Sequence, residues 1–279
     1  MTRTSLREDR RTIGVLVFAA IALAGGLLLL VAVSPWSGSP AEAAPRFASA
    51  KAPWPASLTP VEPAFTPPKP AALRGGSSGS WWAPVRRPVS ARAAPSARAP
   101  VVARLSPVTP EGTSNLVVVL GRTEDDAGRI WIRASLAILP NNTTGWVPRD
   151  GLGGYTNVRT RLVIDVEALT ATLLREGRPI FRADVGVGTP QWPTPRGEFF
   201  IRNRLTAYSS PFYGPLAFGT SARSERLTDW PAGGFVGIHG TNRPELLPGR
   251  VSHGCIRLRN EDILTLGRLM PVGTPVTIR

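Results

Sequence analysis

The residues best suited to chemistry lie close together near the C-terminal end of the chain. The 279 residues include one cysteine, Cys255, and two histidines, His239 and His253, and the earlier histidine precedes the cysteine by 16 positions. A thiol needs a neighbouring base to be nucleophilic near neutral pH, and an imidazole supplies that base while it stabilises the thiolate. Flanking glycines permit tight turns and leave backbone N–H groups available to a developing oxyanion. The cluster therefore predicts a nucleophilic cysteine with a histidine base.

Two other interpretations of the cluster stay open. A zinc site built from these three side chains needs tetrahedral geometry and a fourth ligand or an open catalytic position. His253 and Cys255 are separated by one residue, which is an unusual spacing for two ligands of one ion. A lone thiol can also be an inert, buried residue that happens to lie near two histidines. The nucleophile interpretation accounts for all three residues, and we expect no metal and no other cofactor.

The sequence around the cluster resembles a known family. The segment Ser252–Leu258 reads SHGCIRL and residues 238–241 read IHGT, which together are similar to the active-site signature of the L,D-transpeptidase (YkuD-type) catalytic domain. Further similarity lies at LVID 162–165, GVG 186–188, TPRGEF 194–199, NED 260–262 and GTPV 273–276. Arg196 stands where Thr is common in the family, and Arg257 stands where some members have Asn.

The resemblance implies a cysteine acyltransferase that acts on peptidoglycan stem peptides. Cys255 is then the nucleophile that expels the terminal D-Ala of a tetrapeptide donor, and His239 is its proton acceptor. The acyl group passes to a side-chain amine of a neighbouring stem, which makes a 3→3 cross-link. The oxyanion hole or its support is expected from His253, Gly254 and Ser252. Substrate contacts are expected from Arg257, Gly240 and Thr241.

Two further functions fit the same residues. Water could release the acyl group, which would make the chain an L,D-carboxypeptidase or endopeptidase, because access of an acceptor rather than the nucleophile decides between the two outcomes. Alternatively the chain could be a wall-binding protein with an idle site, although the presence of Cys255 and both histidines disfavours that interpretation.

A mainly β catalytic domain is expected over residues 158–279. Alternating or continuous apolar runs predict strands at 161–166, 170–174, 179–187, 197–201, 234–239 and 276–278. One helix is expected after the nucleophile, with Asn260 as its cap and an apolar stripe of Ile263, Leu266, Leu269 and Met270. The order of elements lacks the βαβ rhythm of a dinucleotide fold, and the resemblance implies an L,D-transpeptidase-type β-sandwich or barrel.

A smaller β domain is expected to precede it at residues 101–152. Leu116–Leu120 and Arg129–Arg133 have strand patterns, and turn-forming residues follow each of them. The closing sequence GWVP at 145–148 resembles the end of bacterial SH3-like barrels, which implies a small SH3-like barrel before the catalytic domain.

The N-terminus has the properties of a membrane anchor. Residues 13–33 are uncharged and apolar, and at about 1.5 Å per residue a helix of this length spans a hydrocarbon core. Four arginines precede the run, so residues 1–12 are expected in the cytoplasm and the rest outside. Residues 41–43 (AEA) resemble a cleavage site and favour the alternative of a secreted protein. The apolar run at 13–33, however, is longer than the apolar region of most signal peptides.

Residues 34–100 are expected to form a disordered linker rich in Pro, Ala and Arg. Sixteen of the 29 prolines lie between Ser34 and Pro110, and the formal charge of the whole chain is +14. Half of that excess lies in this Pro-rich stretch rather than on a folded face, so we expect no nucleic-acid partner. Attraction to an anionic polymer or to the cytoplasmic membrane surface fits the charge better.

Overall fold

The computed structural model describes residues 79–206, 211–227 and 234–279. The chain divides into the units Met1–Glu62 and Pro63–Arg279, and all of the described residues belong to the second unit. The expected transmembrane helix at 13–33 and the expected linker up to residue 78 lie outside these ranges. Within them, no helix is both long enough and apolar enough to cross a membrane.

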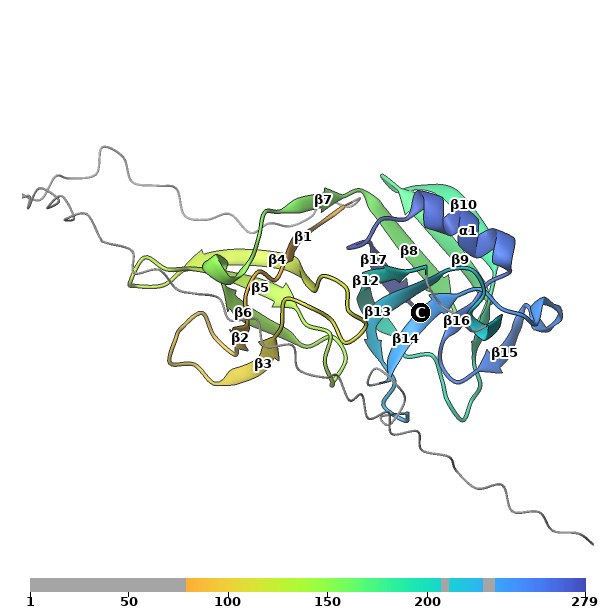
Figure 1. Cartoon of the computed structure of the whole chain (residues 1–279), viewed down its shortest axis with the longest axis horizontal. Coiled ribbons are helices and arrows are strands. Elements are labelled where there is room, and N and C mark those ends of the chain that lie inside the picture. Colours follow the sequence, from red (N-terminus) through yellow and green to blue (C-terminus); the bar gives the residue numbers. More distant parts are fainter. Residues whose placement is uncertain (1–78, 207–210, 228–233) are drawn as a thin grey trace, which may run out of the picture. The chain divides into compact units, whose positions relative to one another are not determined.

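The first part of the described chain is an antiparallel sheet of seven strands (Figure 1). In chain order the strands are β1 (Ser80–Pro84), β2 (Val89–Arg92), β3 (Val101–Leu105), β4 (Leu116–Glu124), β5 (Ile130–Ser135), β6 (Thr144–Pro148) and β7 (Thr156–Val158), with a 3₁₀ turn η1 (Arg149–Gly151) after β6. The order across the sheet is β3-β2-β6-β5-β4-β1-β7. Its core includes Ile132, Ala134 and Val147, all fully buried.

The expected linker boundary at residue 100 is wrong, because strands β1 and β2 lie before it. β1 lies between β4 and β7, and Trp81 and Trp82 pair with Val119 and Val118. Aromatic residues favour strands, and Pro84 is the last residue of β1 rather than an interior one. Proline content alone therefore misplaced the start of the folded region. The SH3-like resemblance stays a prediction.

The second part contains a sheet of ten strands. They are β8 (Thr160–Asp165), β9 (Thr170–Arg175), β10 (Arg178–Asp184), β11 (Gly186–Gly188), β12 (Gly197–Leu205), β13 (Ala217–Arg223), β14 (Phe235–His239), β15 (Gly249–Ser252), β16 (Ile256–Arg257) and β17 (Pro275–Ile278). Two 3₁₀ turns, η2 (Pro211–Tyr213) and η3 (Pro244–Leu246), lie in its connections. The order is β10-β9-β8-β17-β12-β13-β14-β16-β11-β15.

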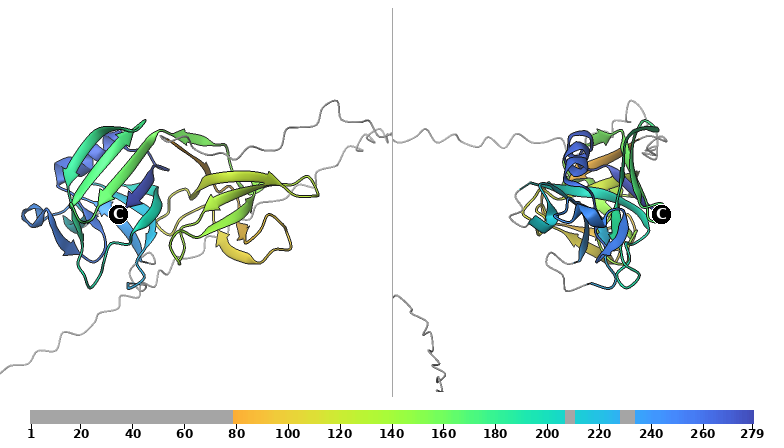
Figure 2. Two further views of the ribbon diagram at one scale, coloured as in Figure 1. Left: turned by 180° about the vertical axis from the view of Figure 1, so that it is seen from behind. Right: turned by 90° about the vertical axis from the view of Figure 1, so that its right-hand side faces the viewer.

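The α-helix α1 (Asn260–Leu269) follows the strand after the nucleophile, as expected. Figure 1 shows it in front of β8, β9 and β10, and the reverse view in Figure 2 shows these strands in front of it. Its buried residues Ile263 and Leu266 join the core of the second sheet. The expected cap is wrong: Arg259 occupies the N-cap position without a side-chain bond. The Oδ1 atom of Asn260 instead accepts the backbone N–H of Thr241 at 2.9 Å.

A buried ion pair joins the two sheets. Arg202 on β12 donates to the Glu111 carboxylate at 2.8 Å, and the two side chains are 2% and 12% exposed. The guanidinium also lies 3.6 Å above the Phe235 ring. Burial lowers the pKa of Arg202 and the Glu111 charge opposes that shift. Because a buried cation without its counter-ion is costly, the second sheet depends on a carboxylate from the first.

A second contact between the sheets lies at Gly273. The Ser80 hydroxyl donates to the Gly273 carbonyl at 3.2 Å. Gly273 has φ +84°, and a Cβ atom there would overlap the Trp82 indole ring. Only glycine therefore fits this turn against the first sheet.

Candidate active site

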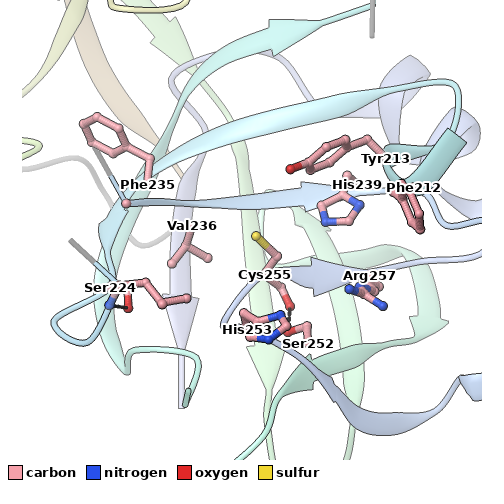
Figure 3. Close-up of a pocket in the computed structure, with 12 residues that line it drawn as sticks. Phe212, Tyr213, Ser224, Phe235, Val236, His239, Ser252, His253, Cys255 and Arg257 are labelled. Carbon is pink, nitrogen blue, oxygen red and sulfur yellow. Dashed lines mark hydrogen bonds between the residues drawn. The ribbon is translucent and has the colours of Figure 1, made fainter. Parts of the chain in front are cut away.

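The pairing of β14 with β16 brings the chemically suited residues together. These strands are parallel neighbours, with Ile238 opposite Ile256 and His239 opposite Arg257. His239 ends β14 and Cys255 immediately precedes β16. A Cβ atom on Gly237 would lie 3.6 Å from the Cδ2 atom of His239 and 3.8 Å from the Sγ atom of Cys255, so both side chains border one glycine. Figure 3 shows the thiol and the imidazole on the same side of the sheet.

A pocket of about 240 Å³ opens over these two side chains. Its lining comprises Phe212, Tyr213, Ser224, Leu227, Gly234, Phe235, Val236, His239, Ser252, His253, Cys255 and Arg257. Five of the eight residues expected from the sequence are therefore on its wall. Gly240, Thr241 and Gly254 are not among them.

His239 is held as a neutral base. The Nδ1 atom lies 2.6 Å from the Gly240 carbonyl oxygen, and since a carbonyl can only accept, we assign the proton to Nδ1. The Nε2 atom is then free to accept a proton. The pKa of His239 is lowered to about 4: burial is the largest cause, the Gly240 carbonyl opposes it, and the positive charge of Arg257 adds to the lowering. The Tyr213 ring contacts the imidazole edge-on, with 4.8 Å between centroids.

Gly240 and Thr241 support His239 from behind. Both are buried, and the Thr241 N–H is fixed by Asn260. A Cβ atom on Gly240 would overlap the Asn260 amide, so the loop after His239 packs tightly on the start of α1. Neither residue is in the pocket lining, and their contact with substrate stays a prediction. They set the orientation of the carbonyl that fixes the His239 tautomer.

Cys255 is a free, half-buried thiol. Burial raises its pKa, whereas the Gly237 N–H, 3.4 Å from Sγ, and the Arg257 charge both lower it. Burial is the largest of these effects. The thiol of Cys255 is therefore protonated at neutral pH and lies beside a neutral imidazole.

Hydrogen bonds fix the turn that carries the nucleophile. The Ser252 hydroxyl donates to the Cys255 carbonyl at 2.6 Å and accepts the Gly254 N–H at 3.1 Å. The Thr194 hydroxyl donates to the Gly254 carbonyl at 2.9 Å. Gly254 has φ +110°, a conformation that other residues rarely adopt. Ser252 and Gly254 thus support the turn, and the N–H of Gly254 is already occupied.

His253 precedes Cys255 by two residues, and Arg257 follows it by two. The His253 ring packs against Trp192, with ring centroids 4.2 Å apart. Arg257 lines the pocket, and its Nε atom is buried with no hydrogen-bond partner among the described residues. An unpaired buried donor is unfavourable unless a ligand satisfies it. Arg257 is therefore the one expected substrate contact whose position fits that role.

Several residues of the site had no functional signal in the sequence. Thr194 was recognised only as part of a strand motif, and Asn260 only as a helix cap. Trp192 and Tyr213 carried no signal, because an aromatic residue outside a regular strand has no spacing that points to a distant strand, and Phe235 was recognised only as part of a predicted strand.

The described ranges contain no group of three or more His, Cys, Asp or Glu side chains that could hold a metal ion. The zinc interpretation therefore has no ligand set in this part of the chain.

Comparisons with known proteins agree with the sequence motifs. The family model described as the L,D-transpeptidase catalytic domain (YkuD) matches residues 159–278. YkuD of Bacillus subtilis strain 168 is 34% identical over 128 residues, which cover 46% of this chain and 71% of that protein. YbiS of Escherichia coli strain K12 is 57% identical over 44 residues, or 16% of this chain and 14% of that protein. The names of both contain L,D-transpeptidase.

Among solved structures, the catalytic domain of the E. faecium L,D-transpeptidase is 26% identical. The alignment covers 43% of this chain and 96% of that domain, with a TM-score of 0.34.

Proposed function

Because the chain belongs to the YkuD family of L,D-transpeptidase catalytic domains, we propose that it joins peptidoglycan stem peptides through a Cys255 acyl-enzyme and makes 3→3 cross-links. The observation that carries this proposal is the shared pocket, in which the free thiol of Cys255 and the neutral base His239 both line the wall. We propose the tetrapeptide donor, the 3→3 cross-link and the Cys255 acyl-enzyme together.

The first half of the reaction acylates the enzyme. The Nε2 atom of His239 accepts the thiol proton as Sγ attacks the carbonyl carbon of the donor's third residue. The tetrahedral oxyanion is stabilised by backbone N–H groups at the turn, for which the Cys255 N–H is the candidate because that of Gly254 is engaged. The C–N bond then breaks, His239 returns the proton to the leaving amine, and D-Ala departs.

The second half transfers the acyl group. A neutral side-chain amine of a second stem attacks the thioester carbon, and His239 accepts a proton from that amine. The C–S bond breaks as the new amide forms, and the thiolate recovers the proton. His239 thus ends each half-reaction neutral, which agrees with a pKa of about 4.

The low pKa of His239 and the raised pKa of Cys255 affect the timing of proton transfer. A preformed thiolate–imidazolium pair is disfavoured in the empty pocket. Proton transfer is therefore expected to accompany attack on the carbonyl, so the charged pair forms only when substrate is in place.

Arg257 is proposed to bind a carboxylate of the donor stem. A guanidinium pairs well with a carboxylate, and its buried Nε atom has an unused proton. Arg257→Gln is then expected to raise the KM for the donor by about tenfold, which corresponds to about 1.4 kcal/mol. An unchanged donor KM would contradict this contact.

The test uses the full chain with a disaccharide-tetrapeptide and identifies the products by mass. Cross-linked dimer and free D-Ala are expected, and Cys255→Ala should yield neither. His239→Ala should slow acylation by about 10²–10⁴-fold, and more than His253→Ala does. Tripeptide without dimer would identify a hydrolase, and a stronger loss in His253→Ala would reverse the roles of the two histidines.

We also propose that residues 13–33 anchor the protein in the cytoplasmic membrane, with the catalytic domain on the cell-wall side. The proposal rests on the length of the apolar run and on the arginines before it.

A further inference from the structure

A second groove lies in the first sheet and shares no described lining residue with the pocket at Cys255. Its volume is about 280 Å³, and its walls come from the hairpin of β2 and β3 and from residues next to β5 and β6. Four arginines line it, Arg87, Arg92, Arg104 and Arg129. No Asp or Glu is among the described residues of its lining, so the groove is strongly basic.

The positive charge of this groove comes from a segment that was expected to be mostly linker. Residues 86–105 contain five arginines and no acidic residue. The structure folds this segment into β2 and β3, which pair at one edge of the first sheet (Figure 1). Part of the basic excess of the Pro-rich stretch therefore lies on a folded face, contrary to the expectation from the sequence, and its side chains can form a site.

Strand pairing gathers the arginines at the groove. Arg104 lies directly opposite Ser90, and because both line the groove, their side chains are on one face of the hairpin. The Arg92 guanidinium donates to the Ala99 carbonyl at 2.7 Å, which fixes its position. Arg104 is exposed, and within the described ranges its side chain has no hydrogen bond or ion pair. Its guanidinium is therefore available to a ligand.

Two carboxylates near the groove are already engaged. Asp150 pairs with Arg87 at 2.7 Å, but the side chains are 72% and 53% exposed, so solvent weakens this ion pair. Asp125 accepts the Trp131 indole N–H at 2.8 Å and the Arg129 backbone N–H at 2.9 Å. These carboxylates leave the groove able to take an oxyanion from a ligand, and guanidinium groups pair with carboxylates in a well-defined geometry.

We propose that this groove binds carboxylate groups of the peptidoglycan polymer and holds the polymer while Cys255 reacts elsewhere on it. The choice of polymer rests on the proposed function, since stem peptides carry free carboxylates. When two sites of one protein bind one polymer, each raises the effective concentration of the polymer at the other. Weak contacts in the groove would therefore keep the enzyme close to its donor stems.

The groove fits other polyanions less well. Proteins that bind single-stranded nucleic acid usually stack bases on exposed aromatic rings. Trp131 is the one aromatic residue among the described residues of the lining, and it is fully buried. A lipid bilayer presents a flat surface, whereas these arginines line a concave one. A flexible polymer with separate carboxylates suits the groove better than either.

The test measures binding of the full chain to peptidoglycan sacculi in a Cys255→Ala background, so that the polymer is not altered. Arg104→Gln/Arg129→Gln should weaken binding by about tenfold, because two charge-assisted contacts are lost. The matched control is Arg175→Gln/Arg178→Gln, an exposed pair on β9 and β10 that removes the same formal charge. The control should bind as tightly as the parent chain.

A second arm of the test uses sacculi whose carboxylates have been converted to amides with a carbodiimide. The parent chain should bind them more weakly than untreated sacculi, and the groove substitutions should then have no further effect. Groove-dependent binding that survives amidation would overturn the inference. Tighter groove-dependent binding to single-stranded DNA or to phosphatidylglycerol vesicles would overturn it as well.

Unchanged affinity of the groove variant for untreated sacculi would also overturn the inference, and so would an equal loss in the control, which would reduce the effect to net charge. With Cys255 intact, the groove variant should release D-Ala from a soluble disaccharide-tetrapeptide at the wild-type rate. Wild-type protein that never releases D-Ala would contradict the proposed function alone, since binding to sacculi is measured without catalysis. The two failures are therefore distinguishable.

Discussion

At the scale of single residues, the pocket keeps both His239 and Cys255 uncharged until substrate arrives. His239 is 3% exposed, and burial is the main cause of its lowered pKa. The same burial keeps the thiol of Cys255 protonated. The positive charge of Arg257 favours a thiolate and disfavours an imidazolium. The site therefore combines a neutral imidazole, which can accept a proton, with a protonated thiol, which can donate one.

The His239 pKa predicts a specific loss of stability in acid. The folded-state pKa of about 4 lies below the usual 6.5, so between these values the unfolded chain binds the proton more readily. Stability is fully present above about pH 6.5 and falls as the pH drops towards 4, by on the order of 3 kcal/mol. Urea unfolding of wild type and His239→Gln from pH 4 to 7 measures this. A difference between the two proteins that does not vary with pH would contradict it.

At the scale of elements, the regular patterns were predictable and the supports were not. Alternation or continuous apolar runs located β8, β9, β12, β14 and β17, and the stripe that includes Ile263 and Leu266 located α1. β1 was missed because prolines around it suggested a linker. β16 has two residues, too few for a pattern, although it positions Cys255.

In the candidate site, too, the residues that do the chemistry were predictable and those that support them were not. The motif around Cys255 and His239 indicated the chemistry, since residue type and spacing carry that information locally. The role of Asn260 depends on a contact with Thr241, 19 positions away, which no local pattern encodes.

Asn260 offers a test of that support. Asn260→Ala removes the acceptor of the Thr241 N–H, and loss of such a part-buried hydrogen bond costs about 0.5–1.5 kcal/mol. The loop beside His239 should loosen, so acylation should slow as well. Asn260→Asp retains the oxygen and should restore most of both. Chemical denaturation and D-Ala release measure the two effects, and failure of Asp to rescue either would argue against the hydrogen bond as the cause.

At the scale of the whole described region, the two sheets depend on each other through Arg202 and Glu111. The guanidinium is 2% exposed and lies against Phe235, a pocket residue. Asn203 also donates to the same carboxylate, at 3.2 Å. A contact between the sheets is thereby linked to the wall of the active site.

Removal of this carboxylate should be costly. Glu111→Ala leaves Arg202 as an uncompensated buried cation, and we expect a loss of about 3–5 kcal/mol in the free energy of unfolding. Arg202→Met in the same chain should recover much of the loss, since it removes the stranded charge. Denaturant titration of the single and double variants is the measurement. Additive losses in the double variant would show that the two residues are not coupled.

The membrane anchor is tested on the full-length protein. If residues 13–33 are retained, the mature protein should fractionate with membranes and keep its original N-terminus. N-terminal sequencing of the purified protein distinguishes the alternatives. A sequence that begins at Ala44, with the protein in the soluble fraction, would instead support cleavage after the AEA segment.

The ion pair also decides where the chain can be cut for laboratory use. A recombinant fragment limited to residues 159–279 would contain the whole sequence motif. It would, however, expose the surface at Gly273 that contacts Trp82, and it would leave Arg202 without its counter-ion Glu111. Such a fragment is expected to express poorly or to aggregate, and low activity in it would say little about the enzyme. Residues 79–279 include both members of the ion pair and both sides of the Gly273 contact, and inhibitor screening or domain exchange between relatives should begin from that boundary.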